Sequence, residues 1–388
     1  MHVIVVGGGV FGAAGALELA HRGHRVTLLQ DGGDEHPRAA STDISKLVRM
    51  DYGADEFYTA LMERALEGWH TWNTRWSSAL YHHTGVTILA PKIGDGGYEG
   101  SSLAVLRRRG HPVQRLEAAE VSARFPAWAA SGMEGYVNPN AGWAQSGKVT
   151  AALHAWGRDA GVARVDSRYA QLLEQGQRVV GVRDADGHEH RGDRVVLALG
   201  AWTARALPEM HHLMWPVAQP VFHFRPIEPS RFEPPAFLPW TADITSTGFY
   251  GFALHPTGVL KVAHHGRGIR VNPDDAGVPD DAALDDFRAF FRRALPSLAD
   301  APAVARRHCL YCDTWDGNFW IDEHPDRPGL VLATGGSGHG FKFAPVLGEL
   351  IADATSGVDN PDRDRFRWRA RSGWTTEDAR QVFAKPQG

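Results

Sequence analysis

Two cysteines three residues apart, Cys309 and Cys312, are the only cysteines in the 388-residue chain. This spacing is compatible with a redox pair, half of a zinc site or a strained short disulfide. A redox pair of this kind normally opens a helix, and zinc needs two more ligands at suitable spacing. The alternative is that both are small, half-buried apolar side chains. The local sequence leaves these interpretations open.

A glycine-rich segment, 335–340, follows the cysteines. It lies between a predicted strand at 329–333 and an apolar, helix-compatible run that starts at Ala344. Glycine in such a segment lets backbone approach a ligand closely. The glycines expected to contact a bound molecule are Gly336, Gly338 and Gly340.

A second glycine motif, G-x-G-x-x-G, lies near the N-terminus. Its glycines are Gly7, Gly9 and Gly12. The motif separates a strand-like run at 3–6 from an apolar helical pattern at 13–20, and another strand is predicted at 25–29. This order is the context in which the motif binds a dinucleotide, with the pyrophosphate at the helix N-terminus.

The residue that usually binds the ribose hydroxyls of such a cofactor is acidic and ends the second strand. Here that position holds Gln30, with Asp31 next to it. Glutamine can bond a diol but lacks the charge assistance of a carboxylate. We expect Gln30 or Asp31 to make this contact. The apolar run 3–20 contains five glycines and Glu18, which argues against a signal peptide or a membrane span.

These motifs resemble the monomeric sarcosine oxidase family of FAD-dependent amine oxidases, within the D-amino acid oxidase superfamily. The C-terminal half carries C-x-Y-x-x-T from Cys309, then F-x-I-D-x-H-P and G-x-S-G-H-G-F-K-F. The resemblance covers nearly the whole chain. It implies an α/β fold with a Rossmann-like FAD-binding domain plus an antiparallel-sheet α+β substrate domain. It also implies covalent attachment of FAD to Cys309 and a flavin contact at Gly200, after a buried strand from 194.

The length favours two domains. We expect a discontinuous FAD-binding domain from 1–80, 145–214 and 308–388, and a substrate domain from 81–144 and 215–307. Further helices are predicted at 55–76, 151–160 and 282–295, and a hairpin at 178–191.

Lysine is rare in this chain, since six of the 41 basic residues are lysines and 41 − 6 = 35 are arginines. The lysines are Lys46, Lys92, Lys148, Lys261, Lys342 and Lys385. Three of them, Lys46, Lys261 and Lys342, fall in segments that contain candidate functional residues. This placement indicates a need for a compact ammonium with an adjustable pKa, although chance is the alternative.

The strand-like segments 249–252 and 258–265 are predicted neighbours. Alternation places Lys261 and His265 on one face and His264 on the other. The resemblance implies that Lys261 activates dioxygen and that Tyr250 and His265 are active-site residues. From the pattern alone, solvent exposure is the alternative for Lys261.

The resemblance also implies a substrate-binding role for Arg49, which corresponds to the arginine that binds the substrate carboxylate. Lys342 is expected to pair with the same carboxylate and to contact the cofactor. Lys46 lies where the family has an arginine over the flavin. From the sequence alone, Lys46 and Arg49 could equally lie on a solvated face.

Bound FAD favours removal of hydride from a carbon next to nitrogen. The amine must be neutral, and deprotonating an ammonium of pKa ~10.4 at pH 7 costs roughly 4–5 kcal/mol. Nearby cations lower this cost. A buried Lys261 ammonium would stabilise superoxide on the way to H2O2, and water would hydrolyse the imine. The expected substrate is a secondary amine with a carboxylate, namely an N-methyl or other N-substituted amino acid.

Other functions stay open. The Asp43-x-x-Lys46 spacing, with Tyr58-Thr59 and Gly68-Trp69, resembles fructosyl amino acid (Amadori product) oxidases. A flavin dehydrogenase with a structural Lys261, a biosynthetic amine or imino acid oxidase, and a non-catalytic nucleotide-binding sensor are further alternatives.

The net charge of −4 is well mixed, which predicts neither nucleic acid nor membrane partners. We expect a monomer whose partners are a small amine and O2. Two cysteines suggest a cytoplasmic protein. The histidine pairs lack a placed third ligand, so no metal is expected.

Overall fold

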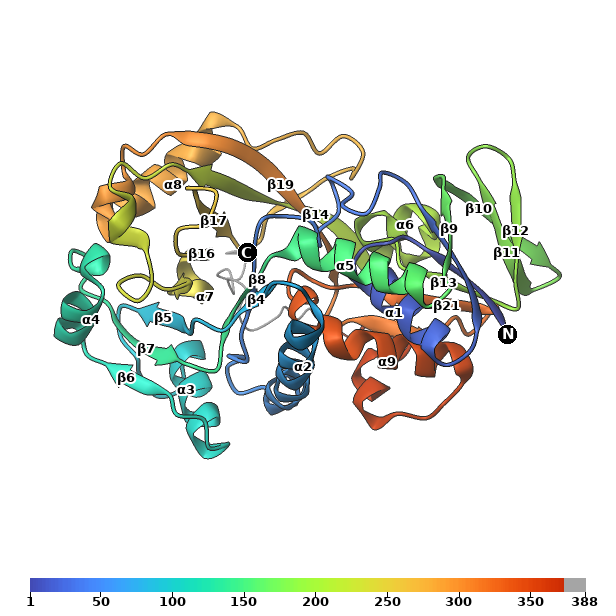
Figure 1. Cartoon of the computed structure of the whole chain (residues 1–388), viewed down its shortest axis with the longest axis horizontal. Helices are drawn as coiled ribbons and strands as arrows, with labels where there is room; N and C mark the ends of the chain where they lie inside the picture. Colours follow the sequence, from blue (N-terminus) through green and yellow to red (C-terminus); the bar gives the residue numbers. More distant parts are fainter. Residues whose placement is uncertain (373–388) are drawn as a thin grey trace.

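A computed structural model describes residues 1–372, and two large sheets dominate it (Figure 1). The first sheet has six strands in the order β20-β21-β13-β1-β2-β9. Its strands are β1 (His2–Val6), β2 (Arg25–Gln30), β9 (Ala163–Asp166), β13 (Arg194–Leu197), β20 (Trp320–Glu323) and β21 (Leu330–Thr334). All neighbours pair in parallel except β20, which is antiparallel to β21. Residues Val3–Val6 of β1 are fully buried, as the continuous apolar run predicts.

Helices α1 (Val10–His21) and α9 (Ala344–Ser356) pack on this sheet, and α5 (Ser146–Asp159) and α2 (Glu56–Arg75) pack on these helices. α1 packs against α5 and α9, and α2 also packs against α9 (Figure 1). A Cβ on Gly348 of α9 would lie 2.8 Å from the Ala14 carbonyl oxygen. The glycine therefore allows the two helices to approach closely.

The second large sheet has nine strands, with the order β18-β14-β17-β16-β15-β5-β7-β6 and β19 paired to β14. Its strands are β5 (Val86–Ala90), β6 (Gln114–Leu116), β7 (Glu134–Asn138), β14 (Met214–Phe224), β15 (Trp240–Ala242), β16 (Phe249–Gly251), β17 (Leu260–His264), β18 (Ile269–Arg270) and β19 (Ala303–Thr314). Aromatic residues of α8 (Asp281–Ala294) pack on it, since Phe287 contacts Phe222 and Phe249.

The long strands β14 and β19 run from the second sheet toward the first (Figure 1). They pair antiparallel from Met214 and Thr314 at one end to Phe224 and Ala303 at the other. Near the first sheet, Ser337 N–H donates to the Cys312 carbonyl at 3.0 Å. β19 therefore carries both cysteines to the glycine-rich segment that follows β21.

Two smaller sheets have three strands each. One consists of β3 (Lys46–Val48), β4 (Tyr81–His82) and β8 (Gly142–Ala144), and the other of β10 (Tyr169–Gln175), β11 (Arg178–Asp184) and β12 (Glu189–Arg191). The hairpin predicted at 178–191 corresponds to β11 and β12 of the latter sheet.

The bounds of two elements differ from prediction. The helix predicted at 151–160 begins at Ser146, whose hydroxyl donates to the Asp43 carbonyl at 2.8 Å. The strand from Arg194 ends at Leu197, because Gly200 has φ +52° and starts a 3-10 turn.

The six-stranded sheet draws its strands from the segments predicted to bind FAD, and the nine-stranded sheet draws mainly from the other two segments. The boundaries themselves stay a proposal, and residues 373–388 of the predicted FAD-binding domain lie outside the described residues. In residues 1–372, no helix is both long enough and apolar enough to cross a bilayer.

Candidate active site

A cavity of about 510 Å³ lies where the carboxyl ends of several parallel strands meet. One wall is the turn after β1 and the other includes the glycine-rich segment after β21. Its walls include residues 6–11, 29–31, 38–41, 198–202, 309–312 and 333–336. Ligands of parallel α/β sheets bind at this edge.

The first glycine turn leaves no space for side chains. Gly7 has φ +97°, and a Cβ there would lie 2.6 Å from the Ala198 carbonyl oxygen. A Cβ on Gly12 would lie 1.8 Å from the Gly7 carbonyl oxygen. Gly9 forms the N-cap of α1. The turn thus brings bare backbone and a helix N-terminus to the cavity wall, which suits a phosphate.

Gln30 and Asp31 line the same cavity at the end of β2. Gln30 is buried, and its Nε2 donates to the Gly33 carbonyl. Its Oε1 is buried without a hydrogen-bond partner among the described residues. An unpartnered buried oxygen is costly, so a ligand donor at this position would satisfy it.

The second glycine segment packs directly on the first. A Cβ on Gly340 would lie 2.8 Å from the ring of Phe11 in α1, and Gly336 lies beside the same ring. Gly338 has φ +78°, and a Cβ there would lie 2.2 Å from the ring of Tyr311. The two glycine clusters, distant in sequence, therefore form adjoining walls.

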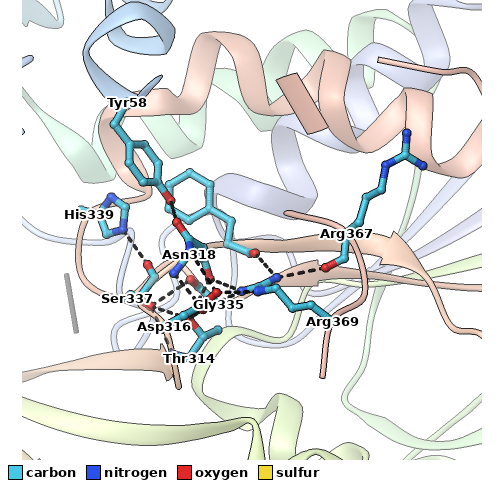
Figure 2. Close-up of polar contacts among 11 residues, drawn as sticks. Tyr58, Thr314, Asp316, Asn318, Gly335, Ser337, His339, Arg367 and Arg369 are labelled. Atoms are coloured by element: carbon cyan, nitrogen blue, oxygen red, sulfur yellow. Dashed lines mark hydrogen bonds and ion pairs between the residues drawn. The ribbon is translucent and has the colours of Figure 1, made fainter. Parts of the chain in front are cut away.

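A network of polar contacts holds the glycine segment 335–340 in place (Figure 2). Ser337 Oγ accepts from the Thr314 N–H at 3.2 Å, and His339 Nε2 lies 3.0 Å from the Gly317 carbonyl oxygen. Asp316 accepts two bonds from Arg369, at 2.5 and 2.7 Å. The turn after β19 therefore ties the glycine segment to the C-terminal part of the described chain.

Cys309 and Cys312 are both free, buried and on β19, and both line the cavity. Lys46 Nζ donates to Cys309 Sγ at 3.3 Å. Burial raises the pKa of the Cys312 thiol to about 11. Their position within a strand, rather than at a helix start, does not match the usual redox arrangement.

Lys261 is completely buried on β17. Its Nζ lies 2.7 Å from Asp43 Oδ2 and donates to the Ser45 carbonyl at 2.5 Å. Burial lowers the pKa of Lys261 to about 8, although Asp43 opposes this shift. Burial also disfavours the charged form of Asp43, yet Lys261 and His223 hold its pKa well below the ordinary value.

Tyr250 lies on β16, and His265 directly follows β17, the strand that carries Lys261. His265 Nδ1 is 3.3 Å from the Tyr311 hydroxyl, and burial raises the pKa of Tyr250. His264 turns elsewhere, with Nε2 2.8 Å from the Thr247 carbonyl oxygen. The predicted separation of His264 from Lys261 and His265 is therefore visible in the contacts.

Arg49 and Lys342 form a second cationic group. Both are buried, and their charged ends lie 5.8 and 4.8 Å from the centre of the Tyr52 ring. Arg49 donates to the Tyr98 hydroxyl at 2.9 Å. The neighbouring Asp51 carboxylate accepts from Tyr136 and Asn138 at 2.6 and 3.1 Å.

The predicted residues thus form three groups. The predicted glycines other than Gly12 line the cavity with Gln30, Asp31 and Cys309, whereas Gly12 packs against the Gly7 carbonyl. Lys46 and Lys261 lie near Cys309, and Arg49 and Lys342 lie at Tyr52. The sequence did not predict the Asp43–Lys261 ion pair, although the Asp43-x-x-Lys46 spacing marked the segment. It contains no signal for His223, whose position depends on the pairing of β14 with β17.

Comparisons with known proteins agree with this geometry. A family model described as FAD dependent oxidoreductase matches residues 2–354. Monomeric sarcosine oxidase of Bacillus sp. (strain B-0618) is 26% identical, and the match covers 90% of each chain. N-methyl-L-tryptophan oxidase of Citrobacter koseri is 27% identical, with 92% of this chain and 94% of the relative covered. The solved structure of fructosamine oxidase (Amadoriase II) from Aspergillus fumigatus is 26% identical with a TM-score of 0.84, covering 98% of this chain and 93% of that chain.

Proposed function

This chain belongs to the FAD dependent oxidoreductase family, and we propose that it oxidises a secondary amine that carries a carboxylate. The observation that supports this substrate is the convergence of Arg49 and Lys342 on the Tyr52 ring. Two buried cations beside one aromatic ring suit a carboxylate ligand. The N-methyl and N-substituted amino acids named for similar oxidases have this group.

The cavity fits FAD, because glycines allow close approach to its phosphates and the buried Gln30 Oε1 can accept a hydrogen bond from a ligand. When bound, FAD supplies the acceptor for a hydride. The residues that would hold it are Gly7, Gly9, Gly12, Gln30, Asp31, Gly200, Gly336, Gly338, Gly340 and Lys342. The finer proposal is that Cys309 forms a thioether with it, since the thiol lies in the cavity wall beside the Lys46 ammonium.

The side chains of this protein would have separate roles in the reaction. Arg49 and Lys342 would hold the carboxylate and turn the α-carbon toward the cofactor. Their charge, together with that of Lys46, favours release of the ammonium proton that must precede hydride removal. Tyr250 and His265 would border the reacting carbon. The imine leaves for hydrolysis in water.

The Lys261 ammonium is proposed to stabilise the anion that forms as O2 gains electrons, which gives H2O2 as the second product. We further propose that the enzyme is monomeric and cytoplasmic and needs only the amine and O2 as partners. The name of the monomeric sarcosine oxidases supports the monomeric state.

A panel of amines tests the substrate. Under anaerobic conditions, sarcosine, N-methyl amino acids, cyclic amino acids and saccharopine-like amines are mixed with the yellow enzyme. Loss of the visible absorbance of oxidised flavin is expected with at least one carboxylated secondary amine, and more slowly with its methyl ester. Bleaching by no member of the panel would contradict the proposed function.

Fructosyl amino acids are the second candidate, supported by the TM-score of 0.84 with a fructosamine oxidase and by the Asp43-x-x-Lys46 spacing. The same panel includes fructosyl-glycine and fructosyl-lysine. Preferential bleaching by these compounds would select this alternative.

A flavin dehydrogenase would differ in the reoxidation of the reduced flavin, whereas a biosynthetic amine or imino acid oxidase would share reoxidation by O2 and differ only in the amine that bleaches it. Lys261→Met should leave bleaching intact and slow reoxidation by O2 by roughly 10²- to 10³-fold, the usual loss for one electrostatic group. Equal reoxidation of both proteins in stopped flow would indicate a structural Lys261 and favour a dehydrogenase.

A further inference from the structure

The amine oxidation proposed above gives Asp43 no role, yet Asp43 forms a buried ion pair with Lys261. The two charged atoms are 2.7 Å apart, and the side chains are 2% and 0% exposed. A lone ammonium in such a place tends to lose its proton, because burial disfavours the charged form. The carboxylate supplies the opposing charge.

His223 lies on the other side of the carboxylate. The register of β14 and β17 places His223 opposite Lys261, and His223 Nε2 is 3.3 Å from Asp43 Oδ1. Its side chain is 15% exposed. His223, Asp43 and Lys261 therefore form a continuous row from a partly exposed position to a fully buried one.

The stoichiometry of the proposed oxidase requires a supply of protons. O2 takes up two electrons and two protons to become H2O2. The hydride from the amine carries both electrons and one proton, which gives the hydroperoxide anion. The second proton has to be delivered to a buried site at this step, because the proton of the substrate ammonium is released earlier, before hydride transfer.

We propose that Asp43 is the counter-ion that keeps Lys261 in place as an ammonium, and that His223 conducts solvent protons to the pair. An N–H bond of Lys261 breaks as an O–H bond of H2O2 forms. The neutral amine regains a proton from solvent through His223 and Asp43. This inference rests on the proposed oxidase function and assigns Asp43 and His223 positioning and proton-supply roles.

Other charged and titratable groups face the pair from three strands. They are Lys46 on β3, Tyr250 on β16, and Arg307 and Cys309 on β19. Burial lowers the pKa of Lys261 to about 8, so the ammonium predominates at pH 7 and is lost as the pH rises through about 8. Removing the Asp43 charge should lower this pKa further, by roughly one to two units.

The first experiment measures Lys261 directly. Lysine labelled with ¹³C at Cε gives six signals in this chain, and the Lys261 signal is assigned by its loss in Lys261→Arg. In the intact FAD-loaded protein, the pKa of Lys261 measured in Asp43→Asn should be at least one unit lower than that in the native protein. Asp353→Asn, another buried carboxylate bound to Arg22 at 2.6 Å, is the control and should leave that titration unchanged. An unchanged Lys261 pKa in Asp43→Asn would overturn the counter-ion role.

The second experiment measures reoxidation of the reduced enzyme by O2 in stopped flow across pH. At pH 7.5, Asp43→Asn should react roughly 3- to 25-fold more slowly, as a pKa shift of one to two units from about 8 implies. His223→Gln keeps the ion pair, so it should retain the Lys261 titration and the anaerobic bleaching rate but raise the solvent deuterium isotope effect on reoxidation.

A native isotope effect and rate in His223→Gln would overturn the proton-supply role. If Asp43→Asn does not fold, Asp43→Glu replaces it, and its Lys261 should titrate closer to the native value than to that of an uncharged site; a value near 6 would contradict the counter-ion role. The NMR titration needs no substrate. Failure of every amine to bleach the native enzyme would therefore count against the proposed function alone.

Discussion

Individual side chains form two cationic groups, which we propose bind the substrate carboxylate and activate O2. Arg49 and Lys342 gather at Tyr52, whereas Lys261 is paired with Asp43. The rarity of lysine in the sequence is enough to indicate Lys261 and Lys342 as candidates. The ion pair itself could not be predicted, because it joins Asp43, in the loop before β3, to Lys261 on β17, more than two hundred positions away.

Arg49→Met should raise KM for a carboxylated amine by roughly 10- to 150-fold, because a hydrogen bond to a charged group contributes about 1.5–3 kcal/mol. Steady-state kinetics on the amine and on its methyl ester measure the effect. The ester lacks the anionic partner and is the control. An equal loss with both compounds would contradict carboxylate binding by Arg49.

Cys309→Ala should release flavin into the supernatant after acid precipitation, because the proposed thioether carbon–sulfur bond can no longer form. Cys312→Ala is the matched control on the same strand and should retain the flavin in the pellet. Absorbance of the two fractions gives the result. Flavin that stays bound in Cys309→Ala and is released in Cys312→Ala would assign the attachment to the other cysteine.

Among the structural elements, the turn after β19 links the C-terminal segment to the cavity wall. Arg369 bonds Asp316 in this turn, and Asn318 accepts from the Tyr58 hydroxyl at 3.0 Å (Figure 2). The sequence predicted the glycines of this region from their spacing. It did not predict the support beneath them, because single charged residues such as Arg369 carry no periodic signal.

Arg369→Ala should lower the free energy of unfolding by about 1–2 kcal/mol at pH 7, a value that allows for solvent screening of a partly exposed pair. Burial raises the pKa of Asp316, but Arg369 more than offsets this and holds it below the ordinary 3.8. The stabilisation is therefore present above pH 3.8 and is lost as the pH falls below it. Urea unfolding at pH 7 and pH 3.5 measures the difference.

Arg367→Ala is the control, because Arg367 makes exposed ion pairs with Asp359 and Asp364. Such pairs contribute little. Equal destabilisation by both variants, or an Arg369→Ala effect that is as large at pH 3.5 as at pH 7, would show that the Asp316 ion pair is not responsible.

For the molecule as a whole, the sequence predicted more of the architecture than of the side-chain contacts. The α/β fold class and the family resemblance are confirmed. The continuous apolar run at Val3–Val6 and the G-x-G-x-x-G spacing after it are strong local patterns, and together they predicted the parallel part of the six-stranded sheet. The two long strands β14 and β19 join the sheets through pairing that no local pattern encodes.

The cavity wall brings together segments from both ends of the chain, so a bound cofactor should stabilise the whole fold. In Cys309→Ala, the melting temperature should rise with added FAD, by the equivalent of about 2.7 kcal/mol at 100 times Kd. The native protein, in which we propose that Cys309 holds the cofactor covalently, should melt independently of added FAD. Thermal unfolding over a range of FAD concentrations checks both, and a flat response in Cys309→Ala would contradict FAD binding in this cavity.

The contact between Phe11 and Gly340 has a consequence for biosynthesis. The N-terminal glycine turn with Phe11 is synthesised first, and more than three hundred further residues must be translated before Gly340 is added. A nascent or prematurely terminated polypeptide that stops before Gly340 lacks this wall. Cofactor uptake is therefore a late event in the maturation of this protein.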